Sequence, residues 1–190
     1  MGSSAEKMHC KSNKGKKVAV TVVSAILLSL LYVMIFSFSE QDGDTSSSLS
    51  LTISRKCAEI LEALQREHWT ESYRESLALY FEHPIRKLAH FCEYACMGVL
   101  IFGIWAPHRP LRPFPKKWFR IELLWVFLSA ALDELHQTFV PGRWGHPADV
   151  LLDTAGGVTG FFFIYLIVLG FTRKKKEKTK KEKKNRFKKK

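Results

Sequence analysis

Polar side chains interrupt two apolar segments in the C-terminal part of the chain, within ALDELHQTFVPGRWGHPADVLLDTAGG (residues 131–157). Those that could do chemistry are Asp133, Glu134, Gln137, Arg143, Asp149 and Asp153. Asp133 with Gln137, and Asp149 with Asp153, are spaced i, i+4 and therefore share a helix face. His136 points elsewhere by ~100° per residue and is weighted below Gln137.

An earlier apolar segment carries a polar stripe near its start. Arg86, His90, Glu93 and Met97 follow one another at spacings of four, three and four residues, which places them along one helix face. Lys87 and Tyr94 lie beside the stripe.

These residues could recognise a charged group or exchange protons. Each ionised acid at bilayer depth costs about 2.5–3.5 kcal/mol on insertion scales, so the five acids need partners. Only three permanent cations are available, Arg86, Lys87 and Arg143. The remaining negative charge can be balanced by protonation of an acid, by a charged His90 or by an external cation. The candidates for catalysis are His90, Glu93, Asp133 and Glu134.

Two other interpretations compete with a functional pocket. The polar groups could form an interhelical network that only aligns the helices. They could also hold a divalent metal through His90, Glu93 and the aspartates, but no close ligand spacing supports this. We therefore expect neither a metal nor a cofactor.

Four apolar segments are predicted to cross a hydrocarbon core ~30 Å thick. The predicted spans are residues 18–38, 84–105, 118–140 and 149–171. Pro84 suits a first helical position, and Gly156 with Gly160 forms a G-x-x-x-G pattern that allows another helix to approach closely. The expected fold is all-α, an integral membrane bundle of about four transmembrane helices with a helical extracytoplasmic loop.

Positive charge predicts the orientation of these spans, because Lys and Arg in short flanking segments stay in the cytoplasm. Residues 1–17, 106–120 and 172–190 are basic and are expected inside. Thirteen of the last eighteen residues are Lys or Arg, in a chain of net charge +12. Residues 39–83 hold nine acids against four basic residues and are expected outside. Both termini are then cytoplasmic, and the polar span ends meet at the outer face.

The two terminal segments leave alternatives open. The basic N-terminus and first apolar run also resemble a signal peptide, but the run exceeds a signal core of ~7–15 residues, which favours a retained anchor. The Lys-rich tail, residues 172–190, either binds anionic inner-leaflet lipid at about 1 kcal/mol per basic residue or only fixes topology.

The outer segment, residues 39–83, is expected to contain two amphipathic helices separated by a break at residues 68–70. Ser72 and Glu75 have capping-box spacing, which predicts that the second helix begins near Ser72. The segment is either a lid on the span ends or an interfacial element that recognises lipid head groups. We prefer the lid, because its apolar face could cover the polar cluster.

Several soluble protein classes are excluded. Nucleic acid is not an expected partner, since the lysines lack an accompanying fold motif or interleaved aromatic residues. The four cysteines lack C-x-x-C spacing, which argues against a disulfide framework or a zinc finger. Walker A, G-x-G-x-x-G, H-E-x-x-H and G-x-S-x-G patterns are absent from the sequence.

Three motifs in order resemble the VanZ-like membrane proteins. They are IRKLAHFCEY (residues 85–94), LDELHQTFVPGR (residues 132–143) and DVLLDTAGG (residues 149–157), and FSFSEQDG (residues 36–43) is similar to the segment after that family's first helix. The site positions that the resemblance implies are Arg86, Lys87, His90, Glu93, Tyr94, Asp133, Glu134, Gln137, Arg143, Asp149 and Asp153. Asp153 is often asparagine in the family, and aspartate here deepens the negative excess.

The resemblance also implies a setting: a cell envelope, typically of a Gram-positive bacterium, and a founding member that is accessory to resistance against teicoplanin, a lipoglycopeptide antibiotic. It supplies no reaction, so whether the protein is an enzyme stays open. The expected location is the cell membrane, as a multi-pass protein. Expected partners are the bilayer, a lipid-linked envelope precursor or lipoglycopeptide, and anionic inner-leaflet lipid at the tail.

Three functions follow from these observations. In the first, the outward polar cluster binds a lipid-linked or lipidated envelope ligand and lowers susceptibility to lipoglycopeptides; Arg86, Lys87 and Arg143 would contact its anionic groups. In the second, the protein is an enzyme acting on an envelope lipid or peptidoglycan precursor, with His90 as general base. The third is a proton-coupled transporter, against which the small number of spans and the lack of a repeat argue.

Overall fold

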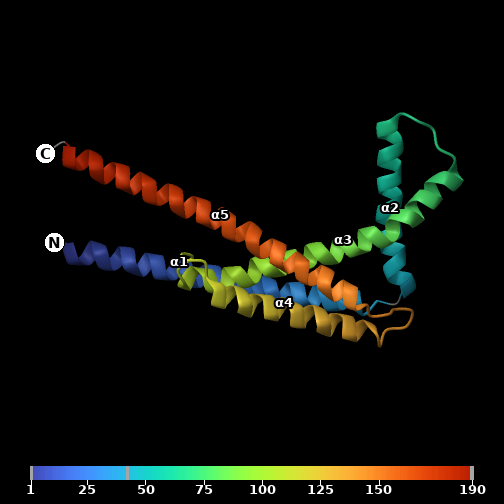
Figure 1. Ribbon diagram of the computed structural model, residues 1–190, viewed down its shortest axis with the longest axis horizontal. Coiled ribbons are helices and arrows are strands. Elements are labelled where there is room, and N and C mark those ends of the chain that lie inside the picture. The colour runs from blue at the N-terminus through green and yellow to red at the C-terminus, as the bar shows by residue number, and fades with distance from the viewer. Residues whose placement is uncertain (1, 42, 189–190) are drawn as a thin grey trace.

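Helices make up all of the regular secondary structure in the described residues (Figure 1). The computed structural model describes the backbone of residues 2–41 and 43–188, and the side chains of residues 14–41, 47–174 and 177–178. The elements are α1 (Gly2–Ser39), α2 (Gly43–Gln65), α3 (Glu71–Trp105), the short 3-10 helix η1 (Ala106–His108), α4 (Lys116–Gln137) and α5 (Pro147–Lys188). The expected all-α fold is confirmed.

The long helices follow one axis, with both ends of the chain at the same end of the molecule (Figure 1). α3 packs against α5 and α1, and α4 packs against α5. At the opposite end, α2 packs on the first part of α3, close to the loop that joins α4 to α5 (Figure 1). The polar ends of the predicted spans lie at this second end.

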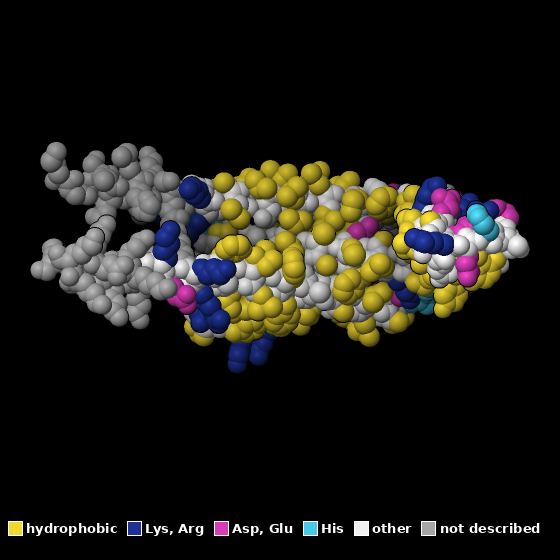
Figure 2. Space-filling view, turned by 90° about the horizontal axis from the view of Figure 1, so that it is seen from above, with side chains coloured by type: hydrophobic (Ala, Val, Ile, Leu, Met, Phe, Trp, Pro, Cys, Tyr) yellow, Lys and Arg dark blue, Asp and Glu magenta, His cyan; other side chains and the backbone are white. Residues whose placement is uncertain are grey.

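Three helical segments are long and apolar enough to cross a membrane. They are Lys14–Ser39, Glu71–His108 and Pro147–Lys174, which contain the first, second and fourth predicted spans. Hydrophobic side chains cover the middle of the face seen in Figure 2, and Lys and Arg gather at the end next to the termini. These helices place the protein in a lipid bilayer.

The third predicted span, residues 118–140, corresponds to α4. This helix is not among the three long apolar segments, because too many acidic and basic residues occur along it. Its acids Glu122, Asp133 and Glu134 are nevertheless buried inside the bundle. Its outward side chains are large and apolar, including Leu124 and Leu128. Three membrane helices are therefore supported directly, and α4 differs from them in its buried acids.

One predicted helix start is wrong. Pro84 lies inside α3 instead of opening it, because α3 begins thirteen residues earlier, at Glu71. The outer segment and the second span thus share one helix. The helix start predicted near Ser72 is confirmed to within one residue, but the capping residue differs: Thr70 is the N-cap, and its side chain accepts a hydrogen bond from the Tyr73 amide. The break predicted at residues 68–70 is confirmed.

Glycines allow α3 and α5 to touch backbone to backbone. A Cβ added at Gly160 would lie 1.9 Å from the Ala95 carbonyl oxygen, and one added at Gly98 would lie 2.1 Å from the Gly157 oxygen. A Cβ at Gly156 would lie 2.4 Å from the Phe91 oxygen. The close approach predicted from G-x-x-x-G is therefore confirmed, with α3 as the partner helix.

Aromatic rings pack the end of the bundle nearest the termini. Phe161 of α5 lies between Phe102, Trp105 and Phe119, with ring centroids 4.9–6.4 Å apart. This cluster joins α3, α4 and α5 where α4 begins, so the three helices are held together at the end opposite the polar span ends.

Replacement of Gly160 by Ala should force α3 and α5 apart, because the new methyl group meets a backbone oxygen that has no free space behind it. We expect a loss of about 1–3 kcal/mol of stability, measured as a lower thermal midpoint in detergent. The matched control is Gly170→Ala in the same helix, where nothing lies within 4 Å of an added Cβ. Equal midpoints for the two variants would contradict the close contact.

Candidate functional site

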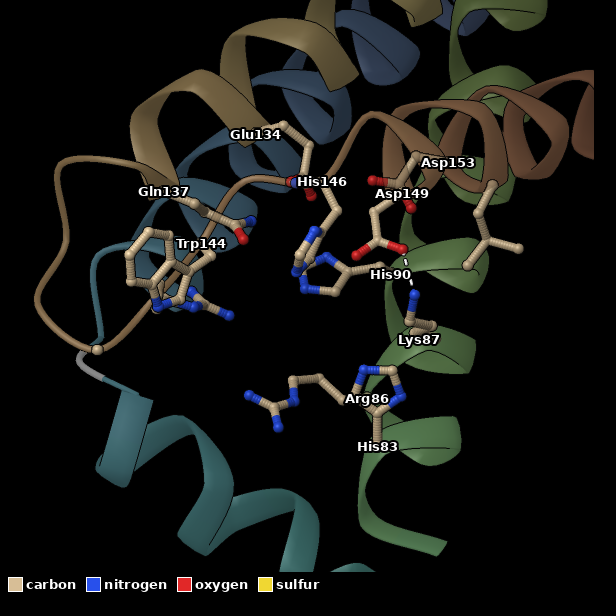
Figure 3. A pocket seen from close by; sticks show the side chains of 13 residues that line it. His83, Arg86, Lys87, His90, Glu134, Gln137, Trp144, His146, Asp149 and Asp153 are labelled. Atoms are coloured by element: carbon tan, nitrogen blue, oxygen red, sulfur yellow. Dashed lines mark hydrogen bonds and ion pairs between the residues drawn. The ribbon is translucent and has the colours of Figure 1, made fainter.

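The three sequence motifs meet at one cavity. It has a volume of about 160 Å³ and lies between α3, the end of α4, the start of α5 and the loop that joins the last two (Figure 3). Eight of the eleven predicted site residues line it: Arg86, Lys87, His90, Glu134, Gln137, Arg143, Asp149 and Asp153. His83, Trp144 and His146 also line the cavity.

Of the other three predicted residues, Asp133 and Tyr94 lie deeper, and Glu93 lines a neighbouring apolar groove. Asp133 and Tyr94 are each 1% exposed, and Tyr94 belongs to the hydrophobic core. Glu93 lies one turn along α3 from His90, with its carboxylate Oε2 3.4 Å from the imidazole Nδ1. Apart from Glu93, the predicted positions thus form a mouth, where the cavity opens, and a buried floor.

Two ion pairs stand at the mouth. The Lys87 ammonium of α3 pairs with the Asp149 carboxylate at the start of α5 (Figure 3). The Arg86 guanidinium pairs with Glu82 at 2.6 Å, and the same Glu82 oxygen accepts a hydrogen bond from the Ser50 hydroxyl at 2.6 Å. Because Ser50 belongs to α2, the outer segment contacts α3 one turn from Arg86, which lines the cavity.

Arg143 ties the loop after α4 to the end of α1. Its Nη1 donates hydrogen bonds to the carbonyl oxygens of Phe38 (3.1 Å) and Ser39 (2.9 Å). These carbonyls lie at a helix C-terminus, where a cation is favoured. Burial lowers the pKa of the Arg143 guanidinium from its ordinary value, and the nearby Arg86 lowers this pKa further. The predicted ligand cation therefore also has a structural role.

The floor holds carboxylates from two helices beside one histidine. Asp133 Oδ2 of α4 accepts a hydrogen bond from the Gln137 side chain at 3.1 Å. Asp153 of α5 is 1% exposed, and its Oδ1 has no hydrogen-bond partner; the same is true of Asp133 Oδ1. One ligand atom each of His90, Asp133 and Asp153 lie within 4.8 Å of one another.

Glu134 binds the loop between α4 and α5. Its Oε2 accepts a hydrogen bond from the His146 backbone amide at 2.8 Å, immediately before α5 begins. This contact holds the turn closed between α4 and α5, so that their polar ends face one another. Two acids of the motifs thus have donors outside their own helix: Asp149 pairs with the Lys87 ammonium, and Glu134 accepts from the His146 amide.

Some residues of the site were not predicted. Glu82, Ser50 and His83 lie outside the quoted motifs, although Glu82 is spaced i, i−4 from Arg86, a spacing that favours an ion pair. His136, which was weighted low, packs its ring against Phe36 with centroids 6.0 Å apart and does not line the cavity.

A second carboxylate site, also unpredicted, lies toward the other end of the bundle. Glu122 of α4 is 2% exposed and accepts a hydrogen bond from the Trp105 indole at 2.8 Å. The sequence around Glu122 carries no polar partner at helical spacing, so only the packing of α3 against α4 shows why this acid is tolerated.

Comparison with protein families identifies the same family that the three sequence motifs resemble. A model of the VanZ/LLP1 family matches residues 24–169, which include α1 from its middle, the outer segment and the three following helices. Neither curated proteins nor solved structures give a significant match. Because the matched region covers most of the chain and contains every residue of the cavity, this membrane protein belongs to the VanZ/LLP1 family.

Proposed function

We propose that the protein crosses the membrane four times and uses its outward-facing cavity to bind a lipid-linked or lipidated ligand of the cell envelope. The observation that carries this proposal is a polar cavity that adjoins an apolar groove. Arg86, His90 and Arg143 line both spaces. A ligand with a charged head and a hydrocarbon chain fits such a pair of connected spaces.

The cavity mouth suits an anionic head group. Arg86, Lys87 and Arg143 supply permanent positive charge there, and guanidinium groups match phosphate or carboxylate oxygens in a bidentate manner. The Lys87 and Asp149 side chains are 36% and 23% exposed. An ion pair this accessible contributes little stability, so Lys87 can exchange Asp149 for a ligand oxygen at low cost.

The groove suits a hydrocarbon chain. It has a volume of about 260 Å³ and lies between the end of α1, the first part of α2 and the middle of α3. Phe38, Leu49, Ile53, Ile85 and Ala89 line it. Because Leu49 and Ile53 belong to α2, a chain in the groove would be covered by the outer segment.

The fourth crossing is α4. Its 22 residues span ~33 Å at a rise of ~1.5 Å per residue, which matches the hydrocarbon thickness. Its acids are buried, and Leu124, Leu128 and Leu132 are exposed on its outer surface. The basic segments at residues 106–120 and 172–190 support cytoplasmic termini and an outward cavity.

Lower susceptibility to lipoglycopeptides is part of the proposal. It is supported by family membership and by the same pair of spaces, since a lipoglycopeptide also joins a polar body to an apolar chain. Binding of the drug itself and binding of a lipid-linked precursor share this chemistry.

The orientation can be tested by cysteine labelling. In a chain whose four native cysteines are replaced by serine, Trp144→Cys should react with a membrane-impermeant maleimide in intact cells, because Trp144 is exposed in the loop at the cavity mouth. Lys117→Cys, at the opposite end of α4, should react only after the cells are broken. The reverse pattern would refute the outward orientation and with it the proposed ligand.

Head-group binding can be tested by native mass spectrometry with a polyprenyl phosphate and the matching uncharged polyprenol. The variant Arg86→Gln/Lys87→Gln should bind the phosphate roughly 100- to 10,000-fold more weakly, since it removes two charge-assisted hydrogen bonds that contribute about 1.5–3 kcal/mol each. Its polyprenol binding should be unchanged.

The matched control for this experiment is Arg109→Gln, which removes a cation at the other end of the bundle, 4.8 Å from the Trp118 ring. Equal weakening by the control, or equal affinity of the wild-type protein for phosphate and polyprenol, would argue against a head-group site. A lipidated and a non-lipidated glycopeptide used as probes in the same way separate drug binding from precursor binding.

A second candidate function is hydrolysis of an envelope lipid diphosphate. It is favoured by the position of His90, which lines both the cavity and the groove and lies 3.4 Å from the Glu93 carboxylate. As a general base His90 would take a proton from water while the water oxygen attacks the terminal phosphorus. The bond from this phosphorus to the bridging oxygen would break, the lipid monophosphate would leave, and the attacked group would become inorganic phosphate.

This candidate requires turnover. His90→Gln should abolish phosphate release from a polyprenyl diphosphate, a loss of at least about 100-fold, while the variant still binds the lipid in native mass spectrometry. No phosphate release by the wild-type protein, or a parallel loss of binding and release in the variant, would leave ligand binding as the function.

A further inference from the structure

Three helices each contribute one metal-ligand side chain to the cavity floor. His90 comes from α3, Asp133 from α4 and Asp153 from α5, and one ligand atom of each lies within 4.8 Å of the other two. An imidazole with two carboxylates is a ligand set used for Zn²⁺ and Mn²⁺. The sequence predicts no metal because these ligands are far apart along the chain, and only the packing of the helices brings them together.

The cluster is buried and incompletely bonded. Asp133 and Asp153 are each 1% exposed, and the Oδ1 atom of each has no hydrogen-bond partner. Buried polar atoms in native proteins nearly always have a partner, so two such carboxylate oxygens beside one imidazole indicate a group that binds between them.

The permanent cations near the cavity are engaged closer to its mouth. Lys87 pairs with Asp149, Arg86 pairs with Glu82, and Arg143 donates to the carbonyl oxygens at the end of α1. His90 is the nearest cationic neighbour that both floor aspartates share, and Arg143 also attracts Asp133. A bound divalent cation would balance both aspartates at once.

The surroundings of the cluster also suit a metal. Ligand atoms on one ion lie at most ~4.4 Å apart, twice a bond of about 2.0–2.2 Å, so a small closure of the side chains completes the site. The Gln137 amide hydrogen-bonds Asp133 at 3.1 Å, and Glu93 lies 3.4 Å from the His90 ring. Such outer contacts orient metal ligands.

We infer that His90, Asp133 and Asp153 bind one divalent transition-metal ion, Zn²⁺ or Mn²⁺, at the floor of the cavity. His90 and Asp153 line the cavity itself, so the ion has a route from the mouth and an open side toward any ligand there. The inference goes beyond the proposed function and does not depend on it, since the site needs no lipid.

The test uses the full chain in detergent, purified without a polyhistidine tag and stripped with a chelator. Titration with Zn²⁺ and with Mn²⁺, followed by calorimetry and elemental analysis, should give about one ion per chain. Asp153→Asn and His90→Gln should each weaken binding at least about tenfold. Glu122→Gln, which alters an equally buried acid away from the cluster, should bind like the wild type.

The outcomes are decisive in both directions. Less than about 0.1 ion per wild-type chain, unaltered binding in Asp153→Asn and His90→Gln, or an equal loss in Glu122→Gln would overturn the inference. If the cluster variants fail to fold, electron spin echo spectra of the Mn²⁺-loaded wild type decide the question. A coupled imidazole ¹⁴N supports the site, and its absence refutes it.

Discussion

Acidic side chains within membrane helices must turn away from hydrocarbon, and this constraint orients α4. Its three acids Glu122, Asp133 and Glu134 are buried, while its leucines face outward. Since an ionised acid facing lipid costs several kcal/mol, no other rotation of the helix about its axis is comparably stable. With α4 fixed in this rotation, Asp133 points toward α3 and α5.

The contact between α3 and α5 completes the arrangement. Gly156 packs on the Phe91 carbonyl, one residue from His90, and Asp153 lies one turn before Gly157 on the same helix. The backbone contact therefore lies directly beside the cluster, which is why side chains as short as aspartate can approach an imidazole on the neighbouring helix. The aromatic packing at the other end of the bundle holds the same helices together.

The site separates into an accessible mouth and a buried floor, and the two parts have different chemistry. At the mouth, each cation has an acid or carbonyl partner and sufficient exposure to exchange it. On the floor, carboxylate oxygens lie buried without partners. Recognition of a charged head group suits the first part, and binding of a cation suits the second.

Much of this protein could be predicted from its sequence. Apolar run length predicted the membrane helices, because the hydrocarbon thickness sets a minimum length. Helical spacing predicted that the polar residues of each motif share a face, and G-x-x-x-G predicted close helix contact. A helix start at Pro84 was predicted wrongly: proline is a strong local signal for a first helical position, but α2 packs on the part of α3 that precedes it.

Which polar residues meet, and with which partners, was decided only by the tertiary structure. Lys87 with Asp149 and Arg143 with the end of α1 are pairs separated by 62 and about 104 residues along the chain. Local spacing carries no information on such pairs, because they depend on the rotation and depth of each helix in the bundle. The sequence by itself determined the helices and their polar faces, and packing determined that three of those faces share one buried floor.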